Sequence, residues 1–156
     1  MKLAILIVED EPEVRDALER DLEEFHEVCR IEVADSVDDA WAAVDEVDED
    51  GDMLALVLAD HRLPGKTGVD FLVEMMEDAR TVDTRKVLVT GQADQDDTIR
   101  ALNDASLDHY FSKPWNVEKL LDEVRELLTD FVLSLGVDPL PHMRALNAVR
   151  VMDALR

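Results

Sequence analysis

Five short apolar runs alternate with five longer amphipathic stretches along most of this chain. The apolar runs, which predict strands, cover residues 3–8, 28–34, 54–59, 86–90 and 109–111. The stretches with helical periodicity cover about residues 12–25, 36–49, 67–79, 95–106 and 116–134. A strict alternation of strand and helix predicts an α/β domain, in which right-handed crossovers build a doubly wound parallel sheet with helices on both faces.

The composition of the runs indicates the order of the five strands. Residues 3–8 and 54–59 are apolar throughout, as expected of central strands that are buried on both faces. Residues 28–34 alternate in polarity and residues 109–111 are very few, so these two runs suit the edges. The predicted sheet order is therefore 2-1-3-4-5, with the switch point between the first and third strands.

The charge of the chain restricts its partners. The 38 acidic residues outnumber the 16 basic ones and give a net charge of −22. Such a field repels nucleic acid and anionic membranes, so we expect no direct contact with either. The apolar run at residues 3–8 is too short for a signal peptide or a membrane span, which predicts a cytoplasmic protein. An adaptation to a salt-rich cytosol and an ordinary acidic bacterial protein both remain open.

Residues 131–156 differ from the rest. They hold two acids and three arginines, so their net charge is +1, which leaves −23 for residues 1–130. After Gly136 and Pro139, apolar residues from Leu140 to Leu155 predict one more amphipathic helix. We divide the chain into a domain at 1–130 and a C-terminal helical extension or linker at 131–156. The extension has three interpretations: a linker, a helix packed on the domain, or a homodimer contact whose arginines meet the acidic body of a second copy.

Polar groups follow four of the predicted strands at their carboxyl ends. Glu9 and Asp10 follow the first strand, Asp60 the third, Thr90 the fourth and Lys113 the fifth. In the predicted sheet these ends converge, and close carboxylates repel by up to ~4 kcal/mol per pair at an effective dielectric near 20. Mg²⁺ would offset this repulsion, while a lysine and a hydroxyl suit a second anion. The set predicts a phosphoryl-transfer site with Asp60 as acceptor.

Each group alone has an ordinary explanation. Glu9 and Asp10 suit the start of a helix, and Asp60 suits a loop. Thr90 suits a strand end, and Lys113 suits a solvated surface. The placement of one group at each required strand end favours the functional interpretation.

Four motifs carry a resemblance to a known family. They are the segment Ile-Leu-Ile-Val-Glu-Asp-Glu-Pro at 5–12, Asp-His-Arg-Leu-Pro at 60–64 with Gly68 after it, Val-Thr-Gly at 89–91, and Tyr-Phe-Ser-Lys-Pro-Trp at 110–115. Over about residues 3–130 the chain resembles the receiver domains of two-component response regulators, which have a flavodoxin-like fold.

The resemblance implies a role for each site residue. Asp60 would take a phosphoryl group from a phosphohistidine of a sensor histidine kinase or phosphotransfer protein. Asp10 and Asp60 would bind Mg²⁺ together with the backbone carbonyl of Arg62, and Glu9 would hold the ion through water. Many members carry aspartate at position 9, so the longer Glu9 side chain is a departure.

Further residues would report the phosphorylated state. Lys113 would bind the phosphoryl oxygens, and Thr90 would move onto the phosphoryl group while Tyr110 turns inward. Arg62 and Gln92 lie at positions that tune phosphoryl lifetime in the family. The resemblance also implies a cis bond before Pro114.

The predicted function is a signalling switch that is not an enzyme for other substrates, and its last helix-strand-helix face would contact a downstream output protein or domain. One alternative is a Mg²⁺-dependent aspartyl phosphatase, but Glu9-Asp10-Glu11 does not supply the Asp-x-Asp pattern expected after the first strand. The other is a binding module that is never phosphorylated.

Overall fold

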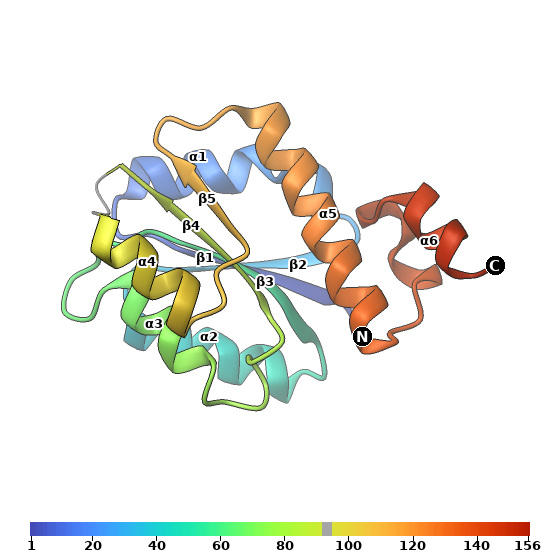
Figure 1. Cartoon of the computed structure of the whole chain (residues 1–156), viewed down its shortest axis with the longest axis horizontal. Helices are drawn as coiled ribbons and strands as arrows, with labels where there is room; N and C mark the ends of the chain where they lie inside the picture. The colour runs from blue at the N-terminus through green and yellow to red at the C-terminus, as the bar shows by residue number, and fades with distance from the viewer. Residues whose placement is uncertain (92–94) are drawn as a thin grey trace.

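The computed structural model describes residues 1–91 and 95–156 and contains one five-stranded sheet. Its strands are β1 (Leu3–Val8), β2 (Cys29–Ala34), β3 (Met53–Ala59), β4 (Arg85–Thr90) and β5 (His109–Ser112). They are ordered β2-β1-β3-β4-β5, and every neighbouring pair is parallel (Figure 1). The predicted fold class and strand order are confirmed.

Helices cover both faces of this sheet. They are α1 (Pro12–Asp21), α2 (Val37–Glu49), α3 (Gly68–Met75), α4 (Gln95–Asp104) and α5 (Val117–Leu135). Figure 1 shows α1 and α5 on one face, and α2, α3 and α4 on the other. The third helix ends earlier than predicted, because the buried hydroxyl of Thr81 donates to the Met75 carbonyl at 2.7 Å and the chain turns there. No described helix combines the length and apolar character that a membrane crossing requires.

The central strand β1 is buried along its whole length. Its alternate residues serve two separate cores: Leu3 packs with α1 and α5, whereas Ala4 packs with α2 and α3. β3 is buried almost as completely. Because both central strands are fixed from two faces, the residues directly after them are held in place.

The C-terminal extension forms two short helical segments where one helix was expected. α5 ends at Gly136, which adopts the left-handed conformation with φ 66°. A 3₁₀ segment, η2 (Leu140–Ala145), is followed by α6 (Ala148–Ala154). The break lies at Asn147, whose side chain accepts from the Arg150 N–H and so begins a new helix.

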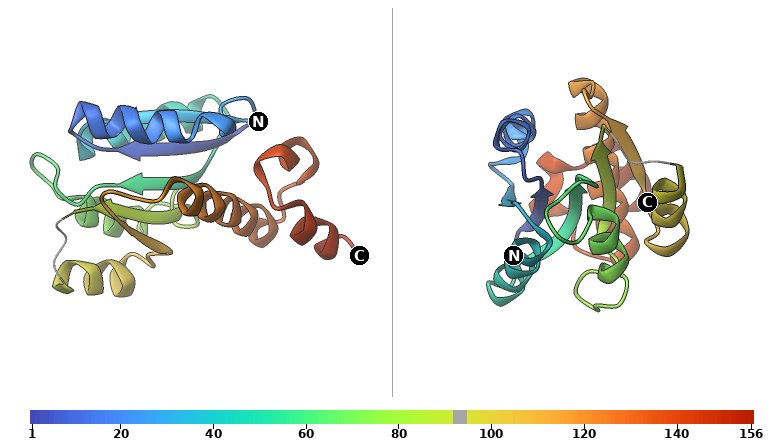
Figure 2. Two further views of the ribbon diagram at one scale, coloured as in Figure 1. Left: turned by 90° about the horizontal axis from the view of Figure 1, so that it is seen from above. Right: turned by 90° about the vertical axis from the view of Figure 1, so that its left-hand side faces the viewer.

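The extension packs against the rest of the chain, beyond the end of the sheet (Figure 2). Leu146 and Val151 are buried in the core shared with α1 and α5. Arg150 pairs with Glu126 at 2.7 Å and with Asp130 at 2.6 Å, both on α5. The division after residue 130 therefore falls within α5, and the extension continues the core of the domain.

Candidate functional site

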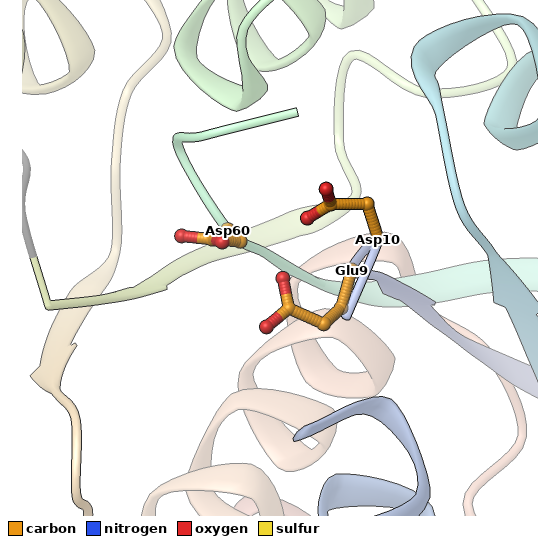
Figure 3. Close-up of side chains that lie close together, drawn as sticks. All are labelled: Glu9, Asp10 and Asp60. Atoms are coloured by element: carbon orange, nitrogen blue, oxygen red, sulfur yellow. The ribbon is translucent and has the colours of Figure 1, made fainter. Parts of the chain in front are cut away.

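Three acidic side chains meet at the carboxyl ends of β1 and β3 (Figure 3). One carboxylate oxygen each from Glu9, Asp10 and Asp60 lies within 4.8 Å of the others. Glu9 is 1% exposed and Asp60 is 5% exposed, whereas Asp10 is exposed to solvent. The predicted convergence of these three residues is thus present in the structure.

The backbone at Glu9 and Asp60 continues the hydrogen-bond ladder of the sheet. The Glu9 N–H donates to the Ala34 carbonyl at 2.9 Å, and the Asp60 N–H donates to the Val8 carbonyl at 2.9 Å. Arg15 on α1 donates to the Glu9 carbonyl at 3.1 Å. Both acids are therefore fixed by main-chain contacts before any ligand binds.

Lys113, directly after β5, lies against the two buried acids. Its ammonium Nζ is 2.6 Å from Glu9 Oε1 and 3.2 Å from Asp60 Oδ2. The Lys113–Pro114 peptide bond is cis, as the resemblance implies. One positive charge thus faces two carboxylates in a partly buried site.

The pKa values of the two buried acids shift in opposite directions. Burial and the neighbouring Asp60 raise the pKa of Glu9 to about 8, against the opposing effect of Lys113. Burial alone would also raise the pKa of Asp60, but hydrogen bonds from Glu9, Thr90 and Lys113 outweigh it and lower that pKa. In the metal-free pair Glu9 therefore holds a proton more readily than Asp60 does.

The acid cluster fits a hard cation. Glu9 Oε2 and Asp60 Oδ1 are buried and have no hydrogen-bond partner among the described residues. A buried carboxylate oxygen without a partner is costly, and a divalent ion with oxygen ligands would satisfy both atoms. Asp10, at the exposed edge of the cluster, adds a third carboxylate. This donor set suits Mg²⁺ better than softer metals.

A pocket of about 250 Å³ opens beside the acids. Asp60, Thr90 and Lys113 line it together with Glu11, Arg62 and Gly91. Its walls offer a carboxylate, a hydroxyl and an ammonium, which suits a phosphoryl group on the Asp60 side chain.

The remaining predicted residues lie around this pocket. Arg62 is exposed at its rim. Tyr110 is half-buried, and its hydroxyl donates to the Thr90 carbonyl at 3.4 Å. Gln92 lies outside the described residues.

Sequence reasoning gave no role to two neighbours of Asp60. Gly68, the first residue of α3, lies so close that a Cβ placed on it would be 1.8 Å from the Asp60 carbonyl oxygen. His61 is buried, and its Nε2 is 3.0 Å from Asp97 Oδ2 on α4. Gly68 could have been noticed in the sequence, because it follows the Asp60 motif. The contact between His61 and Asp97 could not, because it joins residues 36 positions apart and depends on how α4 packs.

The response regulator receiver domain family matches residues 5–125. The hydrogenase transcriptional regulatory protein HoxA of Cupriavidus necator is 34% identical over 122 residues, which are 78% of this chain and 23% of that protein. The phosphate regulon transcriptional regulatory protein PhoB of Escherichia coli is 28% identical over 130 residues, which are 82% of this chain and 52% of that protein. The chain thus spans only about a quarter to a half of these two relatives.

Among solved structures, a CheY-like receiver domain protein from Methanospirillum hungatei is similar with a TM-score of 0.71 and 27% identity. The match covers 84% of this chain and 97% of that one. The family match covers more than half of the chain, and the similar structure has the same fold. The chain belongs to the response regulator receiver domain family of two-component systems.

Proposed function

We propose that this receiver domain accepts a phosphoryl group on Asp60 from a phosphohistidine of a sensor histidine kinase or phosphotransfer protein, in a reaction that requires Mg²⁺. The observation that carries the proposal is the buried Asp60 carboxylate, which faces Lys113 at 3.2 Å and lines an open pocket. The lowered pKa of Asp60 favours its ionised form. An ionised acceptor can attack phosphorus without first losing a proton.

The residues of the site would have separate roles in phosphoryl transfer. An Asp60 oxygen forms the new P–O bond as the P–N bond to the donor imidazole breaks, and the leaving imidazole takes up a proton. Bound Mg²⁺ supplies neutralisation of the charge on the transferring group. Glu9, Asp10, Asp60 and the Arg62 carbonyl would hold the ion.

Lys113 and Thr90 would bind the transferred phosphoryl group. The Lys113 ammonium, which faces Glu9 and Asp60 in this structure, would turn to the phosphoryl oxygens. Thr90 donates its hydroxyl to the same group, and Tyr110 follows by turning inward. The domain acts as a cytoplasmic switch whose α4–β5–α5 face signals to an output protein or domain, and it does not contact nucleic acid itself.

Intact-mass measurement after incubation with acetyl phosphate and Mg²⁺ tests the acceptor. The wild type should gain one phosphoryl group, whereas Asp60→Asn should gain none. Asp35→Asn is the matched control, because Asp35 follows the edge strand β2 and is exposed. No gain in the wild type, or a gain in Asp60→Asn, would refute the assignment.

We also propose that the extension mediates a homodimer through its exposed apolar side chains and not through its arginines. The arginines of the extension already form ion pairs within the chain: Arg144 pairs with Glu27, Arg150 with α5 and Arg156 with Asp153. The extension and the end of α5 nevertheless hold five of the ten large apolar side chains exposed among the described residues: Leu135, Leu140, Val149, Met152 and Leu155. Contact between two such surfaces joins the least acidic parts of two copies.

Light scattering with Val149→Glu and Met152→Glu should show a lower mass than the wild type. These substitutions leave the core intact, because both side chains are more than half exposed. A chain cut after Asp130 would be a poor test, since it loses the buried Phe131 and Val132. Leu102→Glu on α4, where the side chain is also more than half exposed, should leave the mass unchanged. A monomeric wild type would exclude the dimer.

A further inference from the structure

The residue after the acceptor, His61, connects the site to α4. His61 is 8% exposed, and its Nε2 lies 3.0 Å from Asp97 Oδ2 in the first turn of α4. The other ring nitrogen, Nδ1, is buried and has no hydrogen-bond partner among the described residues. The ring is therefore best satisfied with its proton on Nε2, which donates to Asp97.

The His61 end of this contact is rigid. The Asp60 N–H is bound to β1, and the His61 carbonyl accepts from the Gly68 N–H at 2.9 Å. Gly68 also packs directly against the Asp60 carbonyl. Main-chain contacts on both sides thus fix residues 60 and 61. The His61 side chain can therefore hold α4 in a defined position.

The α4 end is held by few apolar contacts. Ala101 is the one buried residue in the described helix, while Ile99 and Leu102 are 45% and 54% exposed. Figure 2 shows α4 at the outside of the molecule, on the sheet face that also carries α2 and α3. A further polar contact of α4 is the ion pair to α3 between Arg100 and Asp70 at 2.7 Å, in which both side chains are partly exposed. A helix with so little buried apolar surface depends on its polar contacts for its position.

We propose that His61 is a positioning residue, which holds α4 through Asp97 in the arrangement of the unphosphorylated domain. α4 is the next helix after Thr90 in the chain, so the proposed movement of Thr90 and the His61 contact bear on neighbouring parts of the same β4–α4 region. A contact made in one arrangement only favours that arrangement by its own free energy. His61 thereby sets how readily the domain switches, and this role rests on the proposed phosphorylation of Asp60.

Two measurements on Asp97→Ala test the role of the contact between His61 and Asp97, called the link below. In the unphosphorylated protein, amide hydrogen exchange in α4 should quicken by about fivefold, the equivalent of one ordinary hydrogen bond. The initial rate of phosphorylation by acetyl phosphate should rise by about the same factor, because the switch-competent fraction grows. Asp96→Ala is the matched control: Asp96 lies in the same turn and is exposed, so it loses the same interaction with the helix dipole.

A double-mutant cycle separates the link from a general effect on α4. His61→Leu keeps similar volume and should give the same increase in exchange as Asp97→Ala, and the double variant should add nothing further. Equal exchange in Asp97→Ala and Asp96→Ala, or additive effects of the two link variants, would overturn the proposal. If the wild type takes up no phosphoryl group, the proposed function fails, while the exchange measurement still decides whether the link exists.

Discussion

Replacing Gly68 by alanine is expected to lower the free energy of unfolding by about 3 kcal/mol, at the upper end of overpacking effects. The added Cβ would lie 1.8 Å from the Asp60 carbonyl oxygen and 2.7 Å from its carbon, so backbone must move. Neither side yields easily: Asp60 is bound to β1, and Gly68 begins α3 under the Thr67 capping box. A loss of stability would itself be informative, because replacing glycine by alanine in an unobstructed helix raises the free energy of unfolding by up to about 1 kcal/mol.

Urea denaturation monitored by circular dichroism measures this change. Gly91→Ala is the control, since a Cβ there would lie at an ordinary 3.8 Å from Lys113 Cβ, and it should alter stability much less. The Gly68 variant should also be phosphorylated more slowly, because the displaced carbonyl belongs to the acceptor itself. A variant as stable as the wild type would show that the loop after β3 adjusts freely, which would contradict the rigidity assigned to it.

The site was predictable from the sequence because its geometry is a consequence of topology. Buried parallel strands are visible as apolar runs, and the carboxyl ends of such strands share one edge of the sheet. The positions of Glu9, Asp10, Asp60 and Lys113 then follow from counting to the end of each run. No side-chain detail was needed.

Contacts that depend on how helices pack were not predictable. His61 and Asp97 meet only because α4 lies over α3, and the arginines of the extension turn back to α5 instead of outward. Lys86 is a further example: it begins a predicted strand, and lysine is ordinarily solvated, yet it is 1% exposed and donates to the carbonyl of Thr84 at 2.8 Å. Periodicity assigns a side chain to a face but does not say where a long side chain ends.

In metal-free buffer, the wild type is expected to lose stability as the pH rises from about 5 to about 8, relative to Glu9→Gln. The pKa of Glu9 is raised from 4.5 to about 8 in the folded chain, first by burial and then by Asp60. The folded state therefore keeps a proton that the unfolded state releases in this window, and each pH unit costs at most about 1.4 kcal/mol. The total is on the order of 3 kcal/mol. The lowered pKa of Asp60 acts with the opposite sign and below its ordinary value of 3.8, outside this window.

Mg²⁺ should reverse this loss, because an ion that binds only the folded state stabilises it and requires deprotonated ligands. Its affinity should rise by up to about tenfold per pH unit towards about pH 8 in the wild type, and much less in Glu9→Gln. Glu11→Gln, an exposed acid at the same pocket, should behave as the wild type in both measurements. Parallel stability curves for the wild type and Glu9→Gln would mean that Glu9 is ionised throughout. If the curves diverge as expected, Mg²⁺ binding offsets the stability that ionisation of Glu9 removes from the folded state, by an amount that grows with the concentration of the ion.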